Sequence, residues 1–509
     1  MAAAADDRDA ARRGAETAEE LAGTLESRVW NGLGWSFVNT LIGRLGSVLT
    51  GIVIARIVAP EQFGVYAVAL VALNLLLSMN ELGVSVALVR HPGPVAAIAP
   101  TVTTVAVATS LVLFVASWFA AEPFAGAMGV PEAAGVVRLM STAVLIDGIA
   151  SVPVAMLTRD FMQATRTKID LIAFAVSTPA TILFALAGQG AWSLAWGAVI
   201  GNAVTGLLSL LWAPQRFRPG FDRTIAVSLL RFGLPLAGAS LLLLALMNVD
   251  FVVVGRLLGT EQLGFYLLAF NLSTWPMTLV STAARRVTTP MFARLHERGD
   301  GQAGFRQALF LLLALGGLLC ALLAAYAPAI VVFLYGERWA PAAAALPALV
   351  VLSLGRILVE LTYDYLVAVG RTLGNAWVHA VWLVVLVPAL VLGAAYFGIR
   401  GVAWAHALVV MLVVVPALGI VLRRAGNRIW PLVADLGLPA AGAAAVLVSA
   451  YLVSSVLPSG FAELAVGGVV GTVVYAAIVG SRFWRILRAL RGARPEPRTP
   501  GRRRSARST

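Results

Sequence analysis

The sequence predicts an all-α polytopic membrane protein with about 14 transmembrane helices, arranged as two parallel-repeat six-helix lobes plus two extra C-terminal helices. Three observations predict this fold class. Of 509 residues, 60% are hydrophobic and 12% are charged, which is more apolar surface than a soluble protein can bury. The apolar residues gather in stretches of roughly twenty, the length that crosses a bilayer. A short motif also occurs twice, at residues 54–69 and 254–269.

Each predicted transmembrane helix is an apolar stretch close to the length that spans a bilayer. The stretches cover residues 33–58, 63–89, 98–120, 135–157, 168–187, 191–213, 229–257, 263–284, 305–334, 341–368, 374–396, 399–422, 433–457 and 461–481. The longest loop on the outer side, residues 120–134, is small and weakly charged. The loops therefore leave no room for an extramembrane catalytic domain.

Positive charges in the loops predict the orientation of the chain, because cytoplasmic loops of membrane proteins are enriched in Arg and Lys. Alternate loops, counted from a cytoplasmic N-terminus, carry most of these residues. The opposite loops carry only Arg56, Arg138, Arg256, Arg338 and Arg400. This bias predicts an even number of helices with both termini in the cytoplasm.

The repeated motif predicts two similar lobes. Residues 54–69 read IARIVAPEQFGVYAVA and residues 254–269 read VGRLLGTEQLGFYLLA, so both copies place an Arg before a turn and then Glu-Gln, Gly and Tyr. A weaker similarity relates residues 188–197 to residues 396–405. Because the offset spans an even number of crossings, the lobes share one orientation and form a parallel repeat, as in transporters with a central pathway.

The repeat and the charged segments together predict the domain organisation. The predicted parts are a cytoplasmic N-terminal tail (1–28), an N-lobe with the first six spans (29–213), a cytoplasmic inter-lobe linker (214–231), a C-lobe with the next six spans (232–425), two further helices (426–481) and a basic cytoplasmic C-terminal tail (482–509). The N-terminal tail has mixed charge and no apolar core, which excludes a cleaved signal peptide. The C-terminal tail either binds anionic lipid of the inner leaflet or only sets the topology.

Motifs that carry chemistry are few. Cys320 is the only cysteine, the four histidines are scattered without metal-ligand spacing, and no glycine-rich nucleotide motif is present. The sequence therefore predicts no cofactor and no metal site, and it predicts a transporter and not an enzyme. The basic composition is explained by membrane topology and does not indicate nucleic-acid binding.

Several segments together resemble a known family. The second copy of the motif with the residues before it, NVDFVVVGRLLGTEQLGFYLLA (248–269), is similar to the polysaccharide transporter family, the oligosaccharide flippases of the multidrug/oligosaccharidyl-lipid/polysaccharide flippase superfamily. Further matching segments are LTRDF (157–161), ALAGQGAWSLAWG (185–197), FGLPLAGA (232–239) and TTPMFARL (288–295). The resemblance covers about residues 30–425 and does not extend to the last two helices or to the tails.

The resemblance implies a flippase that moves an oligosaccharide repeat unit, linked to undecaprenyl pyrophosphate, across the bacterial cytoplasmic (inner) membrane by alternating access. Such a protein serves the export of cell-surface polysaccharide. The implied partners are the lipid-linked oligosaccharide, membrane lipids and the polysaccharide polymerase and export machinery, and the chain is expected to be a monomer. The sugar is not specified, and coupling to sodium, to protons or to neither stays open.

Arginines in or at the ends of the spans are the candidates for binding a pyrophosphate, because intramembrane charge is costly and a guanidinium binds two oxygens. Arg44 and Arg356 lie in the middle of their spans. Arg44 has no acid three or four positions away, which favours a role in the cavity, whereas Glu360 is close enough to neutralise Arg356. The inner ends of the spans carry Arg90, Arg285 and Arg286. These three either bind the headgroup or only set the topology.

Acids within the spans are candidates for coupling to an ion or for balancing the arginines. They are Asp250, Glu81, Asp147, Glu360 and Asp364. The resemblance implies that an acid on the span 229–257, here Asp250, binds a coupling cation together with polar residues of the span 374–396. That span offers Asn375 and His379, both near its inner end. The alternative is that Asp250 bonds to neighbouring backbone or to Arg256.

Two other functions stay open on the sequence. An ion-coupled exporter of drugs or metabolites would share the fold and differ in its cargo. An integral-membrane polysaccharide polymerase or ligase would need a sizeable outer loop with catalytic groups, which the short loops disfavour. The leading prediction is therefore a flippase for a lipid-linked oligosaccharide.

Overall fold

The computed structural model describes residues 43, 46–80, 95–160, 162–215, 217–297, 301–369, 373–458 and 460–492. Every regular element in this part of the chain is a helix, which confirms the predicted all-α fold class. The described residues form two compact units. Unit 1 comprises the described residues up to Phe270, Val331–Ala345 and His379–His406, and unit 2 comprises Asn271–Ile330, Leu346–Val378 and the described residues from Ala407 onward.

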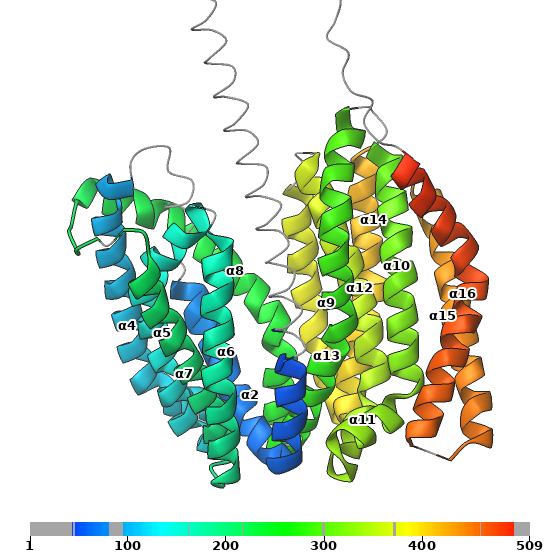
Figure 1. The fold of residues 1–509 in the computed structure, drawn as a ribbon, viewed down its shortest axis with the longest axis horizontal. Coiled ribbons are helices and arrows are strands. Elements are labelled where there is room, and N and C mark those ends of the chain that lie inside the picture. The colour runs from blue at the N-terminus through cyan, green and yellow to red at the C-terminus, as the bar shows by residue number, and fades with distance from the viewer. Residues whose placement is uncertain are drawn as a thin grey trace, which may run out of the picture. The chain divides into compact units, whose positions relative to one another are not determined.

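Unit 1 contains the helices of the first half of the chain (Figure 1). They are α2 (Pro60–Asn80), η1 (Val95–Ala97), α4 (Ala99–Ala127), η2 (Pro131–Ala133), α5 (Ala134–Arg159), α6 (Gln163–Leu186), α7 (Ala191–Trp212) and α8 (Arg223–Leu258). α5 packs against α2, α4 and α7, and α7 in turn packs against α6. Ile98, Val102, Val152 and Met156 belong to the apolar core where α4 meets α5. α5 is therefore the central helix of this group.

Unit 2 contains most helices of the second half. They are α10 (Gly301–Ala325), α12 (Leu346–Ala368), the π-helical turn η4 (Val410–Val414), α14 (Val415–Arg424), α15 (Ile429–Val456) and α16 (Phe461–Gly492). Three helices contribute residues to both units, α9 (Thr260–Glu297), α11 (Ala327–Tyr335) and α13 (Leu373–Val409), and η3 (Glu337–Ala344) belongs to unit 1. α10 is central in unit 2, because it packs against α12, α15 and α16 (Figure 1).

Local sequence explains where several helices begin and end. Asp222 caps the N-terminus of α8, since its carboxylate accepts hydrogen bonds from the backbone N–H groups of Thr224 (2.8 Å) and Ile225 (3.2 Å). Gly259 ends α8 with a φ of 86°, which a residue with a side chain rarely adopts. Gly398 has φ 58° and ψ −146° inside α13, so this element consists of two helical segments.

Twelve helices in the described part of the chain are long and apolar enough to cross a membrane. One of them, Trp377–Arg424, is 48 residues long and contains the break at Gly398, so it accounts for two predicted spans, 374–396 and 399–422. The shorter apolar helix Gly46–Ile57 falls within the first predicted span. The protein is therefore a multi-pass membrane protein.

Two details were not expected from the sequence. The stretch 305–334 is divided into α10 and α11 at Tyr326, where Pro328 follows and has no backbone N–H to continue the helical hydrogen bonds. Within the segment 214–231, α8 already begins at Arg223, because Asp222 supplies the N-terminal cap. Both differences come from side-chain or backbone hydrogen bonding, which a hydropathy pattern does not reveal.

Candidate functional site

Asp250 on α8 is completely buried within unit 1. Its carboxylate accepts hydrogen bonds from the hydroxyl of Tyr266 on α9 (2.8 Å) and from the backbone N–H of Phe251 (3.0 Å). The Phe251 ring packs edge to face against Tyr266 and Phe270, with ring centroids 5.6 and 5.2 Å apart. The carboxylate is therefore held in one orientation beside a group of aromatic rings.

An imidazole completes this buried group. His406 on α13 is completely buried, and its Nδ1 lies 3.4 Å from Asp250 Oδ2. Trp382, in the segment of α13 before the break at Gly398, has its ring centroid 6.2 Å from that of His406 in the segment after it. Among the residues that the structure describes, neither nitrogen of His406 nor Trp382 Nε1 has a hydrogen-bond partner. We refer to Asp250, Tyr266, Trp382 and His406 as the Asp250 group. Since buried polar atoms are normally paired, the unpaired nitrogens of His406 and Trp382 set this group apart from the surrounding apolar core.

The sequence pattern indicated Asp250 but not His406, which was one of four scattered histidines. A usable signal was present. His406 lies well inside the predicted span 399–422, and an ionisable residue within a span is a functional candidate by default. What the pattern could not supply is the contact between α8 and α13, which are far apart in the sequence.

The other expected partners of Asp250 have different contacts. His379 packs with its ring centroid 6.0 Å from that of Trp382, and the side chain of Asn375 lies outside the described residues. Arg256, the alternative partner, donates from Nη1 to the carbonyl of Ala127 (3.4 Å). The hydrogen bonds that hold Asp250 therefore come from a tyrosine hydroxyl and from the backbone.

The two copies of the repeated motif contact each other reciprocally within unit 1. Gly64 in the first copy lies against the backbone carbonyl of Thr260, and Gly264 in the second copy lies against the backbone carbonyl of Pro60. A methyl group at either glycine would overlap the opposite carbonyl oxygen. Position 64 of the first copy contacts position 260 of the second, and the equivalent position 264 of the second copy contacts position 60 of the first. Reciprocal contacts of this kind are the property of a local twofold arrangement. Glycine is needed here because the backbones approach so closely.

The arginines of the two copies make equivalent contacts. Arg56 donates from Nε to the carbonyl of Leu334 (2.9 Å) and from Nη2 to that of Phe333 (2.6 Å), in the last turn of α11. Arg256 donates to the carbonyl of Ala127, the last residue of α4. Each guanidinium therefore binds the carbonyls at the C-terminus of a helix other than its own, where the helix dipole favours positive charge.

Trp339 of η3 joins the two copies of the motif. The side chain is completely buried and donates its Nε1–H to the carbonyl of Ala55 (2.7 Å). Its ring packs edge to face against Phe63 of the first copy and Phe265 of the second, at centroid distances of 4.9 and 6.0 Å. No sequence pattern indicated this role, because Trp339 lies outside both copies.

We expect Arg56→Ala to lower the abundance of the folded protein more than Arg256→Ala, because Arg56 makes two short hydrogen bonds and Arg256 makes one long one. The exposed position of Arg56 limits the expected loss to about 1 kcal/mol of unfolding free energy. The measurement is the midpoint of thermal unfolding of the purified protein, with Arg338→Ala as the control. Normal abundance and stability with lost transport would instead assign these arginines to the substrate.

The other acids and one arginine are distributed over both units. Asp147 on α5, in unit 1, accepts a hydrogen bond from Asn80 Nδ2 (2.9 Å). Arg356, Glu360 and Asp364 lie on one face of α12, in unit 2, and are partly buried. Each of these three has an interaction partner. The face of α12 therefore brings together Arg356 with Glu360, the neighbour predicted to neutralise it, and with a further acid, Asp364.

The remaining candidates cannot be placed by their side chains. Arg44, Glu81 and Arg90 lie outside the described residues. Arg285 and Arg286 belong to α9, and their side chains lie outside the described part. Their roles in binding a pyrophosphate stay predictions from the sequence.

Comparison with known proteins gives matches of three kinds: a protein family, individual relatives and solved structures. Residues 53–344, more than half of the chain, match the family described as Polysaccharide biosynthesis protein. The chain is 27% identical over 495 residues to the succinoglycan biosynthesis transport protein ExoT of Rhizobium meliloti (strain 1021), covering 93% of this chain and 98% of the relative. It is 25% identical over 391 residues to the lipopolysaccharide biosynthesis protein WzxC of Escherichia coli (strain K12), covering 74% of this chain and 78% of the relative.

A solved structure has the same fold. The lipid II flippase MurJ in its inward closed conformation matches with a TM-score of 0.74 at 16% sequence identity, over 89% of this chain and 99% of that chain. The fold class predicted from the sequence is thereby confirmed, and the family match confirms the resemblance drawn from residues 248–269. The chain belongs to the polysaccharide biosynthesis protein family.

Proposed function

We propose that this protein is a flippase that moves a lipid-linked oligosaccharide repeat unit, carried on undecaprenyl pyrophosphate, across the bacterial cytoplasmic membrane for the export of cell-surface polysaccharide. The observation that carries the proposal is the family match together with near full-length similarity to a relative whose name describes transport in succinoglycan biosynthesis. A hydrated sugar joined to a charged diphosphate does not cross the hydrocarbon core unaided, because burying polar and charged groups in lipid is costly.

The repeat supports a mechanism of alternating access. Gly64 and Gly264 bring the two copies of the motif into reciprocal backbone contact, and Arg56 and Arg256 add equivalent hydrogen bonds. A transporter built from two repeats moves its substrate by rocking one repeat against the other around a fixed site. The reciprocal contact between the two copies would serve as the pivot for this movement, since each copy makes the same contact with the other.

The pyrophosphate is assigned to the arginines. Arg44 and Arg356 would face the cavity, and Arg90, Arg285 and Arg286 would meet the headgroup at the cytoplasmic mouth. A guanidinium suits this task because it stays charged at all physiological pH values and donates two parallel hydrogen bonds to phosphate oxygens. Glu360 and Asp364 on α12 would hold Arg356 in position when no substrate is bound.

The Asp250 group supports coupling of transport to an ion gradient. His406 Nδ1 lies 3.4 Å from Asp250 Oδ2, which is ion-pair distance when the imidazole carries a proton. Without the proton, Tyr266 and the backbone of Phe251 still stabilise the carboxylate by hydrogen bonds. Uptake of one proton, or of sodium in its place, changes the charge where α8, α9 and α13 meet. A ligand that binds one conformation more tightly than the other shifts the equilibrium between them.

A substitution series at Arg44 tests the flippase proposal. We expect Arg44→Ala to leave the protein inserted but to lower translocation about tenfold or more, because charge-assisted hydrogen bonds to the diphosphate are lost. Arg44→Lys should rescue in part, since it keeps the charge but not the two-pronged geometry, and Arg44→Glu should be inactive. The measurement is lipid-linked oligosaccharide retained on the cytoplasmic leaflet, normalised to membrane protein. Wild-type transport by Arg44→Ala would contradict the assignment.

A second candidate function keeps the fold and changes the cargo. An ion-coupled exporter would move cationic dyes in proteoliposomes and leave lipid-linked oligosaccharide in place, whereas a flippase would do the reverse. A polymerase or ligase would lengthen or transfer the glycan, which the same lipid extract would reveal. The orientation with both termini in the cytoplasm, action as a monomer and association with the polysaccharide polymerase machinery complete the proposal.

A further inference from the structure

A basic cavity lies in unit 2 where α10, α15 and α16 meet. Its volume is about 340 Å³, and its charged lining consists of Arg306 from α10, Asp435 from α15, and Arg482 and Arg485 from α16. Three guanidinium groups against one carboxylate leave two positive charges in excess. The function proposed above uses none of these residues.

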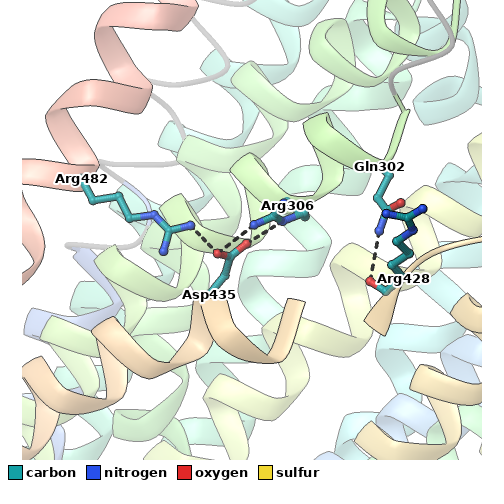
Figure 2. Close-up of polar contacts among 5 residues, drawn as sticks. All are labelled: Gln302, Arg306, Arg428, Asp435 and Arg482. Atoms are coloured by element: carbon teal, nitrogen blue, oxygen red, sulfur yellow. Dashed lines mark hydrogen bonds and ion pairs between the residues drawn. The ribbon is translucent and has the colours of Figure 1, made fainter. Parts of the chain in front are cut away.

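Asp435 fixes two of the arginines. Its side chain is only 4% exposed, and it accepts hydrogen bonds from Arg306 Nε (2.8 Å) and Nη2 (3.2 Å) and a further ion-pair contact from Arg482. Figure 2 shows the two guanidinium groups reaching Asp435 from opposite sides. The Arg482 guanidinium also lies over the ring of Phe310, 4.4 Å from its centroid. Both carboxylate oxygens are therefore occupied, and the two arginines are held in place before any ligand binds.

The arginines keep N–H groups for a ligand. A guanidinium has five N–H donors. Of these, Arg306 uses two and Arg482 one toward Asp435, and Arg485 donates one long hydrogen bond to the carbonyl of Ser481 (3.3 Å) on its own helix. An anion with several oxygens in tetrahedral arrangement matches a cavity lined by three guanidinium groups.

The surroundings indicate where this anion comes from. α15 begins at Ile429, so Asp435 lies only ~9 Å along the helix from its end. α16 exposes apolar side chains, among them Val469 and Val473, and Trp484, which precedes Arg485 in the chain, is 53% exposed. Exposed tryptophan is typical of the level at which lipid headgroups meet the hydrocarbon. The cavity therefore lies at headgroup depth on helices that face lipid.

We propose that this cavity binds the phosphate of an anionic phospholipid headgroup, with Arg485 as its main ligand and with Arg306 and Arg482 positioned by Asp435. Basic pockets between transmembrane helices recognise anionic headgroups in this way. Bound lipid would tie α10, α15 and α16 together. Binding of a membrane lipid at this cavity does not depend on which substrate the protein transports.

The test is lipid binding by the purified full-length protein in neutral detergent, followed by native mass spectrometry and by the midpoint of thermal unfolding. The probes are phosphatidylglycerol, phosphatidylcholine and inorganic phosphate. We expect phosphatidylglycerol to bind and raise the midpoint, with phosphatidylcholine binding more weakly. Arg485→Gln should weaken phosphatidylglycerol about tenfold, as expected for losing a charge-assisted hydrogen bond, and Arg485→Lys should weaken it less. Arg488→Gln, one turn further along α16 and outside the cavity lining, should bind as the wild type does.

Three results would overturn the proposal. Equal binding of phosphatidylglycerol and phosphatidylcholine by the wild type would exclude recognition of an anionic headgroup. Equal weakening by Arg485→Gln and Arg488→Gln would show that general surface charge, and not the cavity, attracts the lipid. A shift of the midpoint by inorganic phosphate as large as that by phosphatidylglycerol would assign the cavity to a free anion. Loss of folding does not obscure the test, because Arg485 is not bonded to Asp435.

Discussion

Gly264→Ala, which adds a single methyl group, is expected to lower the amount of folded protein in the membrane severely. The new Cβ would overlap the backbone carbonyl of Pro60, and a backbone carbonyl cannot move aside as a flexible side chain can. Overpacking at such a contact costs on the order of 3 kcal/mol, a large part of the stability of a typical protein. Gly64→Ala, which meets the carbonyl of Thr260, should have the same effect.

Gly51→Ala is the matched control for this pair. Gly51 lies in the helix Gly46–Ile57, and a Cβ there would meet no atom within 4 Å. The same substitution should therefore be neutral or stabilise the helix by up to about 1 kcal/mol. Abundance in the membrane and the midpoint of thermal unfolding are the measurements. Tolerance of alanine at Gly264 would mean that the two copies of the motif do not approach as closely as the structure shows.

Asp250→Ala should destabilise the protein by about 1–3 kcal/mol, because it leaves the buried Tyr266 hydroxyl without the carboxylate that accepts its hydrogen bond. Asp250→Asn is the more informative change. The amide oxygen can still accept from Tyr266, so the folded protein should persist, but the charge that would hold a proton or a cation is lost. We expect Asp250→Asn to abolish the stimulation of transport by an imposed ion gradient.

The measurement for Asp250 is transport of lipid-linked oligosaccharide in proteoliposomes, with a pH gradient in one set and a sodium gradient in another. His406→Gln should remove the response to the pH gradient if the shared ion is a proton. Glu122→Gln, which breaks an exposed ion pair with Arg138, is the control and should respond as the wild type does. Gradient-driven transport by Asp250→Asn at the wild-type rate would limit the Asp250 group to a structural role.

The candidate site was predictable only in part from the sequence. Asp250 was indicated because an acid within a membrane span is rare and costly. His406, Tyr266 and Trp382 were not grouped with it, since their contacts join α8, α9 and α13, and no local spacing encodes such a contact. The basic cavity could not be predicted for the same reason, because its arginines and its carboxylate come from three helices. In the sequence these residues resemble the charges that set the membrane topology.

The membrane environment, the fold class and the family resemblance of this protein could all be predicted from its amino-acid sequence. Apolar segments long enough to span a membrane are expected to form helices, because in lipid every backbone N–H and C=O group must be hydrogen-bonded within the segment. The repeated motif indicated two similar lobes, because segments of similar sequence form similar helices. Which charges are paired, and where the two copies of the motif touch, could be learned only from the three-dimensional contacts. Pairing depends on distances of a few ångströms between segments far apart in the chain, as with Gly264 against Pro60 and Asp435 between Arg306 and Arg482.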